Sequence, residues 1–401
     1  MAPAPLPIAR PAEIGLSEAG LRRLSAAFSR EIDSRRLPGA VALIARRGRV
    51  GFVESLGARD PKTGAPMAAD AIFRIYSMTK PIVSVATMML VEEGRLLLGD
   101  TLSKYLPDFA APKVGLEARD SATGRSTIEL VPATREITIQ DLLRHTSGLT
   151  YEFRGSGGVH KRYIDAQVFR RDQTNADFAA TLAKLPLLHQ PGSRWEYSRS
   201  TDVLGRLVEV IAGKPLGEAL AERILRPLSM VDTGFHTPAS EQHRLAEPFE
   251  KDPDTQEVVS LLDPRTPPMF QSGGGGMVST AQDYARFLAM LANGGALEDV
   301  RLLARKTVEF MTADHLGSIP GAETLTGPGY GFGLGFAVRL ADGIAATPGS
   351  AGQYYWGGIA GTTFWVDPRE QLFAVMMIQA PGQREHYRAL FRNLVYASLA
   401  D

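Results

Sequence analysis

A serine and a lysine three residues apart are the first pair in this chain with types and spacing suited to chemistry. The segment FRIYSMTKPIVSVATMMLVEEG contains Ser77 and Lys80, and Pro81 comes early in the apolar stretch that follows. Proline is tolerated in the first turn of a helix, so the spacing predicts a helix that begins near Ser77. An i,i+3 pair lies on one helix face, where the Lys80 amine can reach the Ser77 hydroxyl.

A serine hydroxyl is a weak nucleophile until a base takes its proton. A lysine can act as that base only if burial or a nearby cation lowers its pKa from about 10.4. Ile75, Ile82 and Val83 are apolar neighbours suited to bury Lys80. A lone S-x-x-K arises by chance about once in a chain of this length. Ser77 is, however, the one serine in this sequence followed by a lysine three residues later.

Acyl transfer also needs a proton donor for the leaving group, and Tyr197 is the candidate. It lies in WEYSRSTDVLGRLVEVIAG, just before a predicted helix opened by Ser200, Thr201 or Asp202. From such a loop a phenol can point into a cleft. A phenolate beside a lysine ammonium is stabilised by charge, so Tyr197 and Lys80 are expected to share one mobile proton.

Glycines at two places indicate close approach of the backbone. In YYWGGIAGTTFWVDP, Gly357 and Gly358 follow Trp356 and lead into a strand-like run. Glycines there let a substrate reach the backbone, whose N–H groups can stabilise an oxyanion, although a glycine bulge in a sheet is a common alternative. The run Gly273–Gly276 predicts a second point where the backbone passes close to another group.

The elements that must position these residues follow from periodicity. Residues 16–36 have the apolar spacing of an amphipathic helix, and AVALIARRGRVGFVESLG reads as a hairpin around Arg47 and Gly48. Residues 77–230 are mainly helical in pattern. Strand signals return in GYGFGLGFAVRL, TTFWVDP and QLFAVMMIQA, before a final helix in EHYRALFRNLVYASLA. One sheet is therefore expected to take strands from both ends of the chain, with a helical lobe inserted.

These patterns predict two domains. Residues 1–72 and 273–401 are expected to form a discontinuous α/β sheet domain, and residues 73–272 a helical domain, with the active site in the cleft between them. Proline and charged residues from Pro238 to Pro268, and glycines from Gly317 to Gly329, predict surface loops near the rim of this cleft.

Composition excludes several classes of function. The 401 residues include 44 Lys and Arg and 44 Asp and Glu, so no overall field would gather nucleic acid or anionic lipid. The chain has no cysteine, which removes disulfides and thiolate nucleophiles. The N-terminus lacks the apolar core of a secretory signal, and no apolar run reaches membrane-spanning length. We expect a cytoplasmic protein with neither a nucleic-acid nor a membrane partner; its oligomeric state is not predicted.

Two rival hydrolase classes lack their motifs. An α/β-hydrolase needs a G-x-S-x-G elbow, and PGSAG has Pro348 where the first glycine belongs. The seven histidines show no H-E-x-x-H spacing, so no metal or other cofactor is expected. His145, in LLRHTSGLT, is expected to have a structural role near a helix end.

In their order along the chain, S-M-T-K, Y-S-R and W-G-G resemble the marks of the serine β-lactamase and penicillin-binding protein superfamily. The match is most similar to its esterase branch, the family VIII carboxylesterases. LLRHTSGLT, PGSRWEYSRSTDVLGRLVE and GGGGMVSTAQDYARFLAMLANGG also resemble segments of this group, and the resemblance spans about residues 15–395. It implies an α+β fold in which a central antiparallel sheet is flanked by helices and carries an inserted, mostly helical lobe.

The resemblance also implies residue roles. Ser77 would be the nucleophile, Lys80 and Tyr197 the general base and acid, and the backbone N–H groups of Ser77 and Ile359 the oxyanion hole. Ile359 is placed by counting past W-G-G. Substrate-binding roles would fall to a further set: Trp356, Gly357, Gly358 and Arg199.

Two departures from the β-lactamase pattern bear on the substrate. Arg199 stands where Asn is usual after the tyrosine, and Trp356 stands where Lys opens K-T-G. A lysine there would supply a charge for a carboxylate, whereas tryptophan offers an apolar face and one N–H donor. We therefore expect hydrolysis of short-chain or neutral small-molecule esters, although Arg199 would bind a carboxylate if it points inward.

Several alternatives share this machinery. A β-lactamase or D-alanyl-D-alanine peptidase, an acyltransferase and an amide hydrolase would all use the same nucleophile and differ in acyl donor or acceptor. A non-catalytic receptor of the penicillin-binding type is the alternative from another class. The joint presence of Ser77, Lys80 and Tyr197 argues against that receptor.

Overall fold

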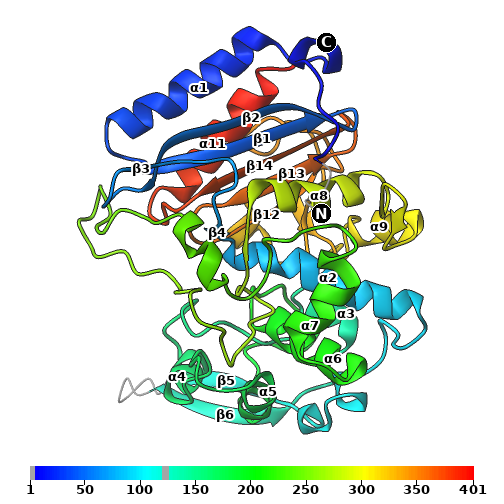
Figure 1. Cartoon of the computed structure of the whole chain (residues 1–401). Helices are drawn as coiled ribbons and strands as arrows, with labels where there is room; N and C mark the ends of the chain where they lie inside the picture. The colour runs from blue at the N-terminus through cyan, green and yellow to red at the C-terminus, as the bar shows by residue number, and fades with distance from the viewer. Residues whose placement is uncertain (1–4, 120–125) are drawn as a thin grey trace.

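The computed structural model describes residues 5–119 and 126–401, which form a sheet with its covering helices above and a mainly helical body below (Figure 1). The sheet has eight strands in the order β10-β11-β12-β13-β14-β1-β2-β3, and each neighbouring pair is antiparallel. The strands are β1 (Gly39–Arg46), β2 (Arg49–Asp60), β3 (Ala65–Pro66), β10 (Tyr330–Phe332), β11 (Ala337–Arg339), β12 (Tyr354–Gly357), β13 (Thr363–Asp367) and β14 (Leu372–Ile378). Because β1 pairs with both β2 and β14, strands from the two ends of the chain meet inside one sheet.

The β1–β2 hairpin forms where the sequence predicts it. Arg47 and Gly48 have φ of 52° and 74°, the left-handed values that a tight two-residue hairpin turn requires. Every residue of β1 is buried, while most residues of β2 are half-buried. The hairpin therefore contributes a central strand and its outer neighbour.

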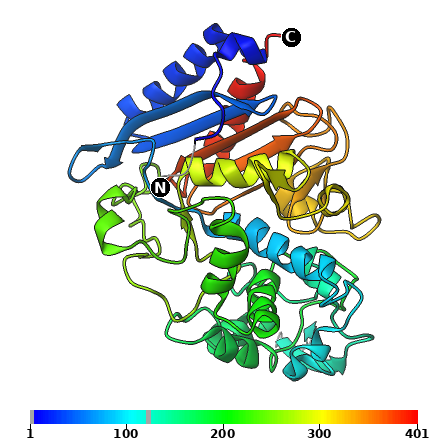
Figure 2. The ribbon, with the colours of Figure 1, turned by 45° about the vertical axis from the view of Figure 1, so that its right-hand side comes forward.

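Helices cover both faces of the sheet (Figures 1 and 2). α1 (Glu18–Asp33) and α11 (Arg384–Tyr396) pack side by side on one face, and α8 (Ala281–Ala292) packs on β14 and β1 from the other. Ser17 begins α1, since its side chain accepts a hydrogen bond from the Gly20 N–H at 3.2 Å. This arrangement confirms the expected α+β fold with a central antiparallel sheet flanked by helices.

The helical body lies between β4 (Phe73–Arg74) and β7 (Val278–Ser279), which pair with each other. Its helices are α2 (Thr79–Glu92), α3 (Ile139–Leu143), α4 (Gly158–Asp165), α5 (Asn175–Leu182), α6 (Ser200–Ala212) and α7 (Leu216–Leu220), followed by a π-helical turn at Ala221–Leu225. The β4–β7 pair ties the two ends of this insertion together. The domain limits at residues 72/73 and 272/273 stay a prediction.

One local expectation differs from the structure. The helical body contains a hairpin, β5 (Lys113–Arg119) and β6 (Ser126–Pro132), in a region expected to be helical. α3 ends at Leu143, two residues before His145, whose φ of 58° lies in the left-handed region, so His145 is near a helix end as expected. The remaining short elements are β8 (Ala296–Leu297), β9 (Val300–Arg301), α9 (Arg305–Met311) and α10 (Glu323–Thr326).

The two predicted loops have little regular structure. Residues 238–268 contain one 3-10 helix, Ala239–Arg244, and residues 317–329 contain the single turn α10. No helix within residues 5–119 and 126–401 is long and apolar enough to cross a membrane.

Candidate active site

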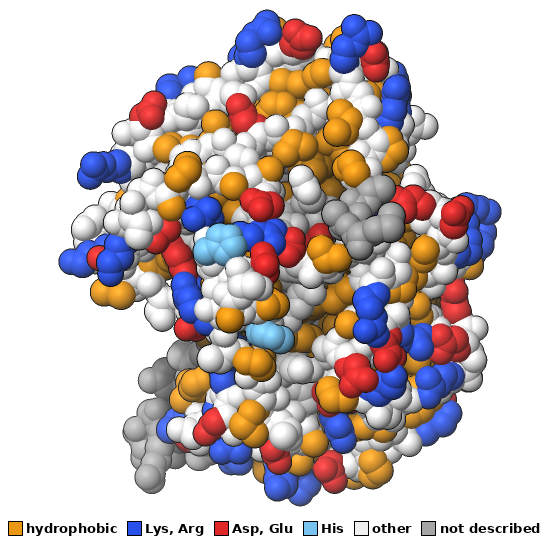
Figure 3. Space-filling model, viewed as in Figure 1, with side chains coloured by type: hydrophobic (Ala, Val, Ile, Leu, Met, Phe, Trp, Pro, Cys, Tyr) orange, Lys and Arg blue, Asp and Glu red, His pale blue; other side chains and the backbone are white. Residues whose placement is uncertain are grey.

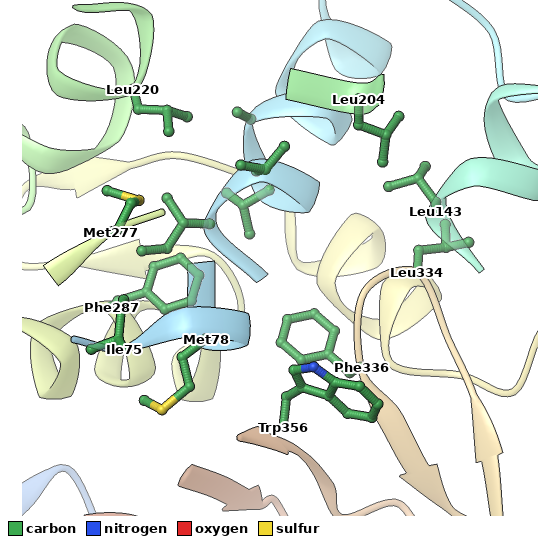
Figure 4. Packing of buried hydrophobic residues seen from close by; sticks show 14 of the residues in the cluster. Ile75, Met78, Leu143, Leu204, Leu220, Met277, Phe287, Leu334, Phe336 and Trp356 are labelled. Carbon is green, nitrogen blue, oxygen red and sulfur yellow. The ribbon is translucent and has the colours of Figure 1, made fainter. Parts of the chain in front are cut away.

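Ser77 and Lys80 lie at the start of α2, as the spacing predicts. Ser77 is in the 3-10 turn Tyr76–Met78, and Lys80 is in the first turn of α2, 1% exposed. Ile75 and Met78, on either side of the serine, pack into the core beside Phe287 (Figure 4). The apolar packing therefore fixes the backbone from which both side chains project.

The Lys80 amine contacts three oxygens. Its Nζ lies 2.6 Å from the Gly274 carbonyl oxygen, 2.9 Å from the Tyr151 hydroxyl and 3.4 Å from Ser77 Oγ. It also lies 4.5 Å from the centre of the Tyr197 ring. The three donors of a lysine ammonium thus match three acceptors, one of which is the candidate nucleophile.

Tyr197 makes the shortest contact with the serine. Its hydroxyl donates to Ser77 Oγ at 2.7 Å, and Trp356 Nε1 donates to the Tyr197 oxygen at 3.3 Å. The Tyr197 and Trp356 rings lie 5.3 Å apart. The structure therefore brings Ser77, Lys80, Tyr197 and Trp356 into one cluster.

Tyr151 belongs to the same cluster but was not predicted. Its hydroxyl contacts Lys80, and the Arg199 guanidinium lies 4.7 Å above its ring. Burial, together with nearby Asp202, raises the pKa of Tyr151 well above its usual value, so it stays a neutral phenol. The one signal in the sequence was its position directly after LLRHTSGLT.

Tyr76, beside the nucleophile, is also held in an unusual conformation. Its φ of 43° lies in the left-handed region, which costs an aromatic residue backbone energy. The Tyr76 hydroxyl accepts a hydrogen bond from the Leu262 N–H at 2.8 Å, so the rim loop helps to hold it. This strain orients the turn that carries Ser77.

Arg199 lies at the cavity wall, with its guanidinium bonded to acids of the protein. Nη2 and Nε contact the Glu152 carboxylate at 2.5 and 3.2 Å, and Nη1 lies 3.4 Å from Asp202. These carboxylates raise the pKa of Arg199 despite its burial. The sequence made Arg199 a candidate for binding a substrate carboxylate. In the structure, its guanidinium already contacts two carboxylates of the protein.

The glycine run passes close to α6, as its composition predicts. A Cβ on Gly273 would lie 2.6 Å from the Thr201 carbonyl oxygen. The Gly274 N–H donates to Asp202 at 2.9 Å, while its carbonyl accepts from Lys80. The run thus links the amine to the helix that follows Tyr197.

His145 supports the Tyr197 loop from behind. The Ser198 N–H donates to its Nδ1 at 3.3 Å, and its ring lies 5.0 Å from the Tyr197 ring. Burial, aided by the charge of Lys80, lowers the pKa of His145 well below its usual value, so the ring stays neutral. The expected structural role fits these contacts.

The W-G-G segment forms the end of β12 opposite Ser77. The Gly358 N–H donates to the Thr362 carbonyl at 2.8 Å, and Arg388 holds the Gly358 carbonyl at 2.5 Å. Ile359 follows, 46% exposed, and among the described residues no acceptor bonds its N–H. Ser77 and Ile359 both line the cavity, so the two residues named for the oxyanion hole border the same hollow.

Replacing Gly358 by alanine is expected to damage both the site and the fold. The added Cβ would lie 2.4 Å from the Ile75 carbonyl oxygen and 2.4 Å from Thr362 Oγ1, so the strand must move away from the nucleophile turn. Such overpacking typically costs about 1–3 kcal/mol. Urea unfolding and ester turnover measure the two effects. Gly99→Ala is the matched control, since nothing lies within 4 Å of its Cβ; equal behaviour of the two variants would contradict the role of Gly358.

The cluster opens into a cavity of about 1080 Å³. From the helical body it is lined by Phe153, Phe169 and Phe270, among others, and from the segments of the sheet side by Leu325, Tyr330 and Tyr355. Leu262 and Leu325 bring the two predicted rim loops to its wall. Among the residues with described positions, no group of three His, Asp or Glu side chains is arranged to hold a metal ion.

Two features define the class of this protein: the antiparallel sheet with its inserted helices, and the cluster of Ser77, Lys80 and Tyr197. Together they are those of the serine hydrolases of the β-lactamase fold. The sequence matches the family described as Beta-lactamase over residues 24–397. The chain belongs to this family.

Several other proteins are similar to this chain over most of their length. Protein Rv1367c of Mycobacterium tuberculosis is 38% identical over 356 residues, which cover 86% of this chain and 87% of the relative. Esterase EstB of Burkholderia gladioli is 35% identical over 414 residues, covering 96% and 98%. Among solved structures, EstCE1, described as a hydrolase with promiscuous acyltransferase activity, is 31% identical with a TM-score of 0.80 over 94% of this chain and 99% of that one.

Proposed function

We propose that this chain is a carboxylic ester hydrolase that works through an acyl-enzyme on Ser77. The observation that carries the proposal is the 2.7 Å contact between the Tyr197 hydroxyl and Ser77 Oγ, with the Lys80 amine beside both. The 35% identity to Esterase EstB over nearly the whole of both chains supports an ester as the substrate.

In the proposed reaction, Tyr197 and Lys80 share one mobile proton, which lies on Lys80 in the reacting form, so that Tyr197 is a phenolate beside the Lys80 ammonium. The hydrogen bond then runs from the Ser77 hydroxyl to the Tyr197 oxygen. Ser77 Oγ attacks the ester carbonyl carbon while its proton passes to that oxygen. The N–H groups of Ser77 and Ile359 bind the oxyanion. The C–O bond to the alcohol then breaks, and Tyr197 returns the proton to the leaving alcohol. Water repeats the sequence on the acyl-enzyme and releases the carboxylic acid.

The surroundings of Ser77 favour a substrate that is neutral next to the reacting carbonyl. Trp356 donates its N–H to Tyr197 and brings no charge, where a lysine would attract a carboxylate. Arg199 is balanced by Glu152 and Asp202. A β-lactam carries a carboxylate beside its reactive ring; for that carboxylate the site offers no lysine at the position of Trp356, and the Arg199 guanidinium is already bound to Glu152 and Asp202.

A side-by-side assay on p-nitrophenyl butyrate and nitrocefin tests the proposal. We expect kcat/KM for the ester to exceed that for nitrocefin by at least about 100-fold, the discrimination that one lost charge-assisted contact provides. Comparable or faster nitrocefin turnover would instead support the β-lactamase alternative. Stoichiometric fluorophosphonate labelling of Ser77 without turnover of any ester would support the receptor.

Acyl transfer to an alcohol is a second candidate. The cavity of about 1080 Å³ is larger than a water nucleophile requires, and EstCE1 is described as having promiscuous acyltransferase activity. Butyl butyrate formed from p-nitrophenyl butyrate and n-butanol, measured against butyrate, gives the partition between the two acceptors.

A further inference from the structure

The cavity is strongly basic, although the chain has a formal net charge of zero. Among the described residues that line it, seven are arginines and one, Glu385, is acidic. The outer face in Figure 3 differs, since Lys and Arg side chains there are interspersed with Asp and Glu. The arginines are Arg154, Arg170, Arg171, Arg199, Arg384, Arg388 and Arg392. A hollow whose charged lining is mainly of one sign concentrates the field and attracts ions of the opposite sign, here anions.

Six of these arginines already have partners in the protein. Arg199 contacts Glu152, and Arg154 lies 3.5 Å from Glu196. Arg170 contacts Gln173 and lies 4.0 Å from Asp172. The other three lie on α11: Arg384 and Arg388 contact Glu385, and Arg392 donates to the Tyr330 hydroxyl at 2.9 Å.

Arg171 is the exception. It lies in the connection between α4 and α5 and is half-buried, and no ion pair or hydrogen bond joins its guanidinium to another of the described residues. Burial lowers the pKa of its guanidinium, with Tyr76 as the one nearby group that opposes this effect. A partly desolvated cation without a counter-charge is unfavourable, so a bound anion would stabilise it.

The neighbours of Arg171 on the cavity wall suit a short carbon chain that ends in a carboxylate. Phe169, Leu262 and Phe270 line the same cavity as Arg171 and offer apolar contact. The Tyr76 hydroxyl uses its oxygen to accept from Leu262, which leaves its proton free to donate to an anion. Tyr76 precedes the nucleophile, so this part of the cavity is continuous with the Ser77 turn.

We propose that Arg171 binds a carboxylate at the far end of the substrate, so that the preferred substrates are esters that carry a second, free carboxylate several atoms from the reacting carbonyl. The guanidinium fork matches a carboxylate with two parallel hydrogen bonds. The inference rests on the ester hydrolysis proposed above and specifies its substrate class. It is compatible with a neutral environment at the reacting carbonyl, because the second carboxylate lies at a distance.

Matched pairs of esters test this subsite. The first pair, p-nitrophenyl hemiglutarate and p-nitrophenyl valerate, tests the effect of a free carboxylate on the acyl part of the ester. The second pair, 4-carboxyphenyl butyrate and phenyl butyrate, tests the effect of a free carboxylate on the alcohol part, and its hydrolysis is followed by acid release at constant pH. We expect kcat/KM of at least one anionic ester to exceed that of its neutral partner, and Arg171→Gln to lower this ratio by about 10- to 100-fold, mainly through KM.

Two further variants separate charge from geometry and from general damage. Arg171→Lys keeps the charge but not the fork, so it should retain part of the preference. Arg22→Gln is the matched control, because Arg22 lies exposed on α1, outside the cavity, in an ion pair with Glu18. In this variant, the ratio of kcat/KM between the anionic and the neutral ester should equal that of the unmodified chain. Ratios unchanged in Arg171→Gln, or neutral esters preferred in both pairs, would overturn the inference while leaving ester hydrolysis intact.

A binding measurement keeps the subsite testable if no ester is turned over. Calorimetric titration of Ser77→Ala with monomethyl glutarate should show binding that weakens about 10- to 100-fold in Ser77→Ala/Arg171→Gln. Equal or absent binding in both would overturn the subsite. Binding that depends on Arg171 without any turnover by the unmodified chain would support the subsite and refute the hydrolase proposal.

Discussion

Ser77→Ala and Lys80→Ala are each expected to lower kcat for p-nitrophenyl butyrate by about 10⁴-fold or more. Without Ser77 Oγ no acyl-enzyme forms, and without the Lys80 amine neither the serine oxygen nor the phenol keeps its cationic neighbour. Groups that act as one unit are not additive, so the double variant should be little worse than either single one. Initial rates at saturating ester measure the effect.

Controls for this prediction are available on nearby elements. Ser84→Ala changes a buried serine one turn further along α2, to which Ser77, Lys80 and Tyr197 make no hydrogen bond among the described contacts. Lys104→Ala changes an exposed lysine paired with Asp100. Both should turn over the ester at close to the unmodified rate. Thermal unfolding checks that Lys80→Ala, which empties a buried position, remains folded. A folded Ser77→Ala protein with near-normal turnover would refute the acyl-enzyme on Ser77.

Tyr197→Phe is expected to lower kcat by about 10²- to 10⁴-fold with little change in KM, because it removes a proton carrier and leaves the cavity wall in place. The ring contacts with Trp356 and His145 do not need the hydroxyl. Tyr151→Phe is the informative comparison. It removes the hydroxyl on Lys80 but none on Ser77, so its loss should be smaller. A larger loss of kcat in Tyr151→Phe than in Tyr197→Phe would indicate that Tyr151, and not Tyr197, carries the proton.

Local periodicity explains what could be predicted. Ser77 and Lys80 share a helical face because of their spacing, and the hairpin turn depends on Arg47 and Gly48 adopting positive φ. In both cases a few neighbouring residues determine the local structure. The sheet built from both ends of the chain followed from strand signals at both ends. The resemblance to a known family then related Tyr197 and W-G-G to the serine, which no local pattern could do.

What was missed depends on contacts between distant segments. Tyr151 reaches Lys80 across 71 positions of sequence, and no spacing marks such a pair. Arg199 looks like a candidate for binding a carboxylate until Glu152, 47 positions away, is found against it. Arg171 has no ion-pair or hydrogen-bond partner among the residues that the structure describes, and a sequence cannot show such an absence. The β5–β6 hairpin was missed because its pattern is weak beside the helical signals around it.

The pairing of β1 with β14 has a consequence for how the chain matures. β1 is fully buried in the finished sheet, yet its partner on one side, β14, is more than 300 residues further along and is the last strand of the sheet in chain order. Until β14 is synthesised, this apolar strand has an open edge, a liability for self-association and a cause of slow assembly. The segments that surround the serine meet only when the last strands are in place, so a nascent or truncated chain has no complete catalytic centre.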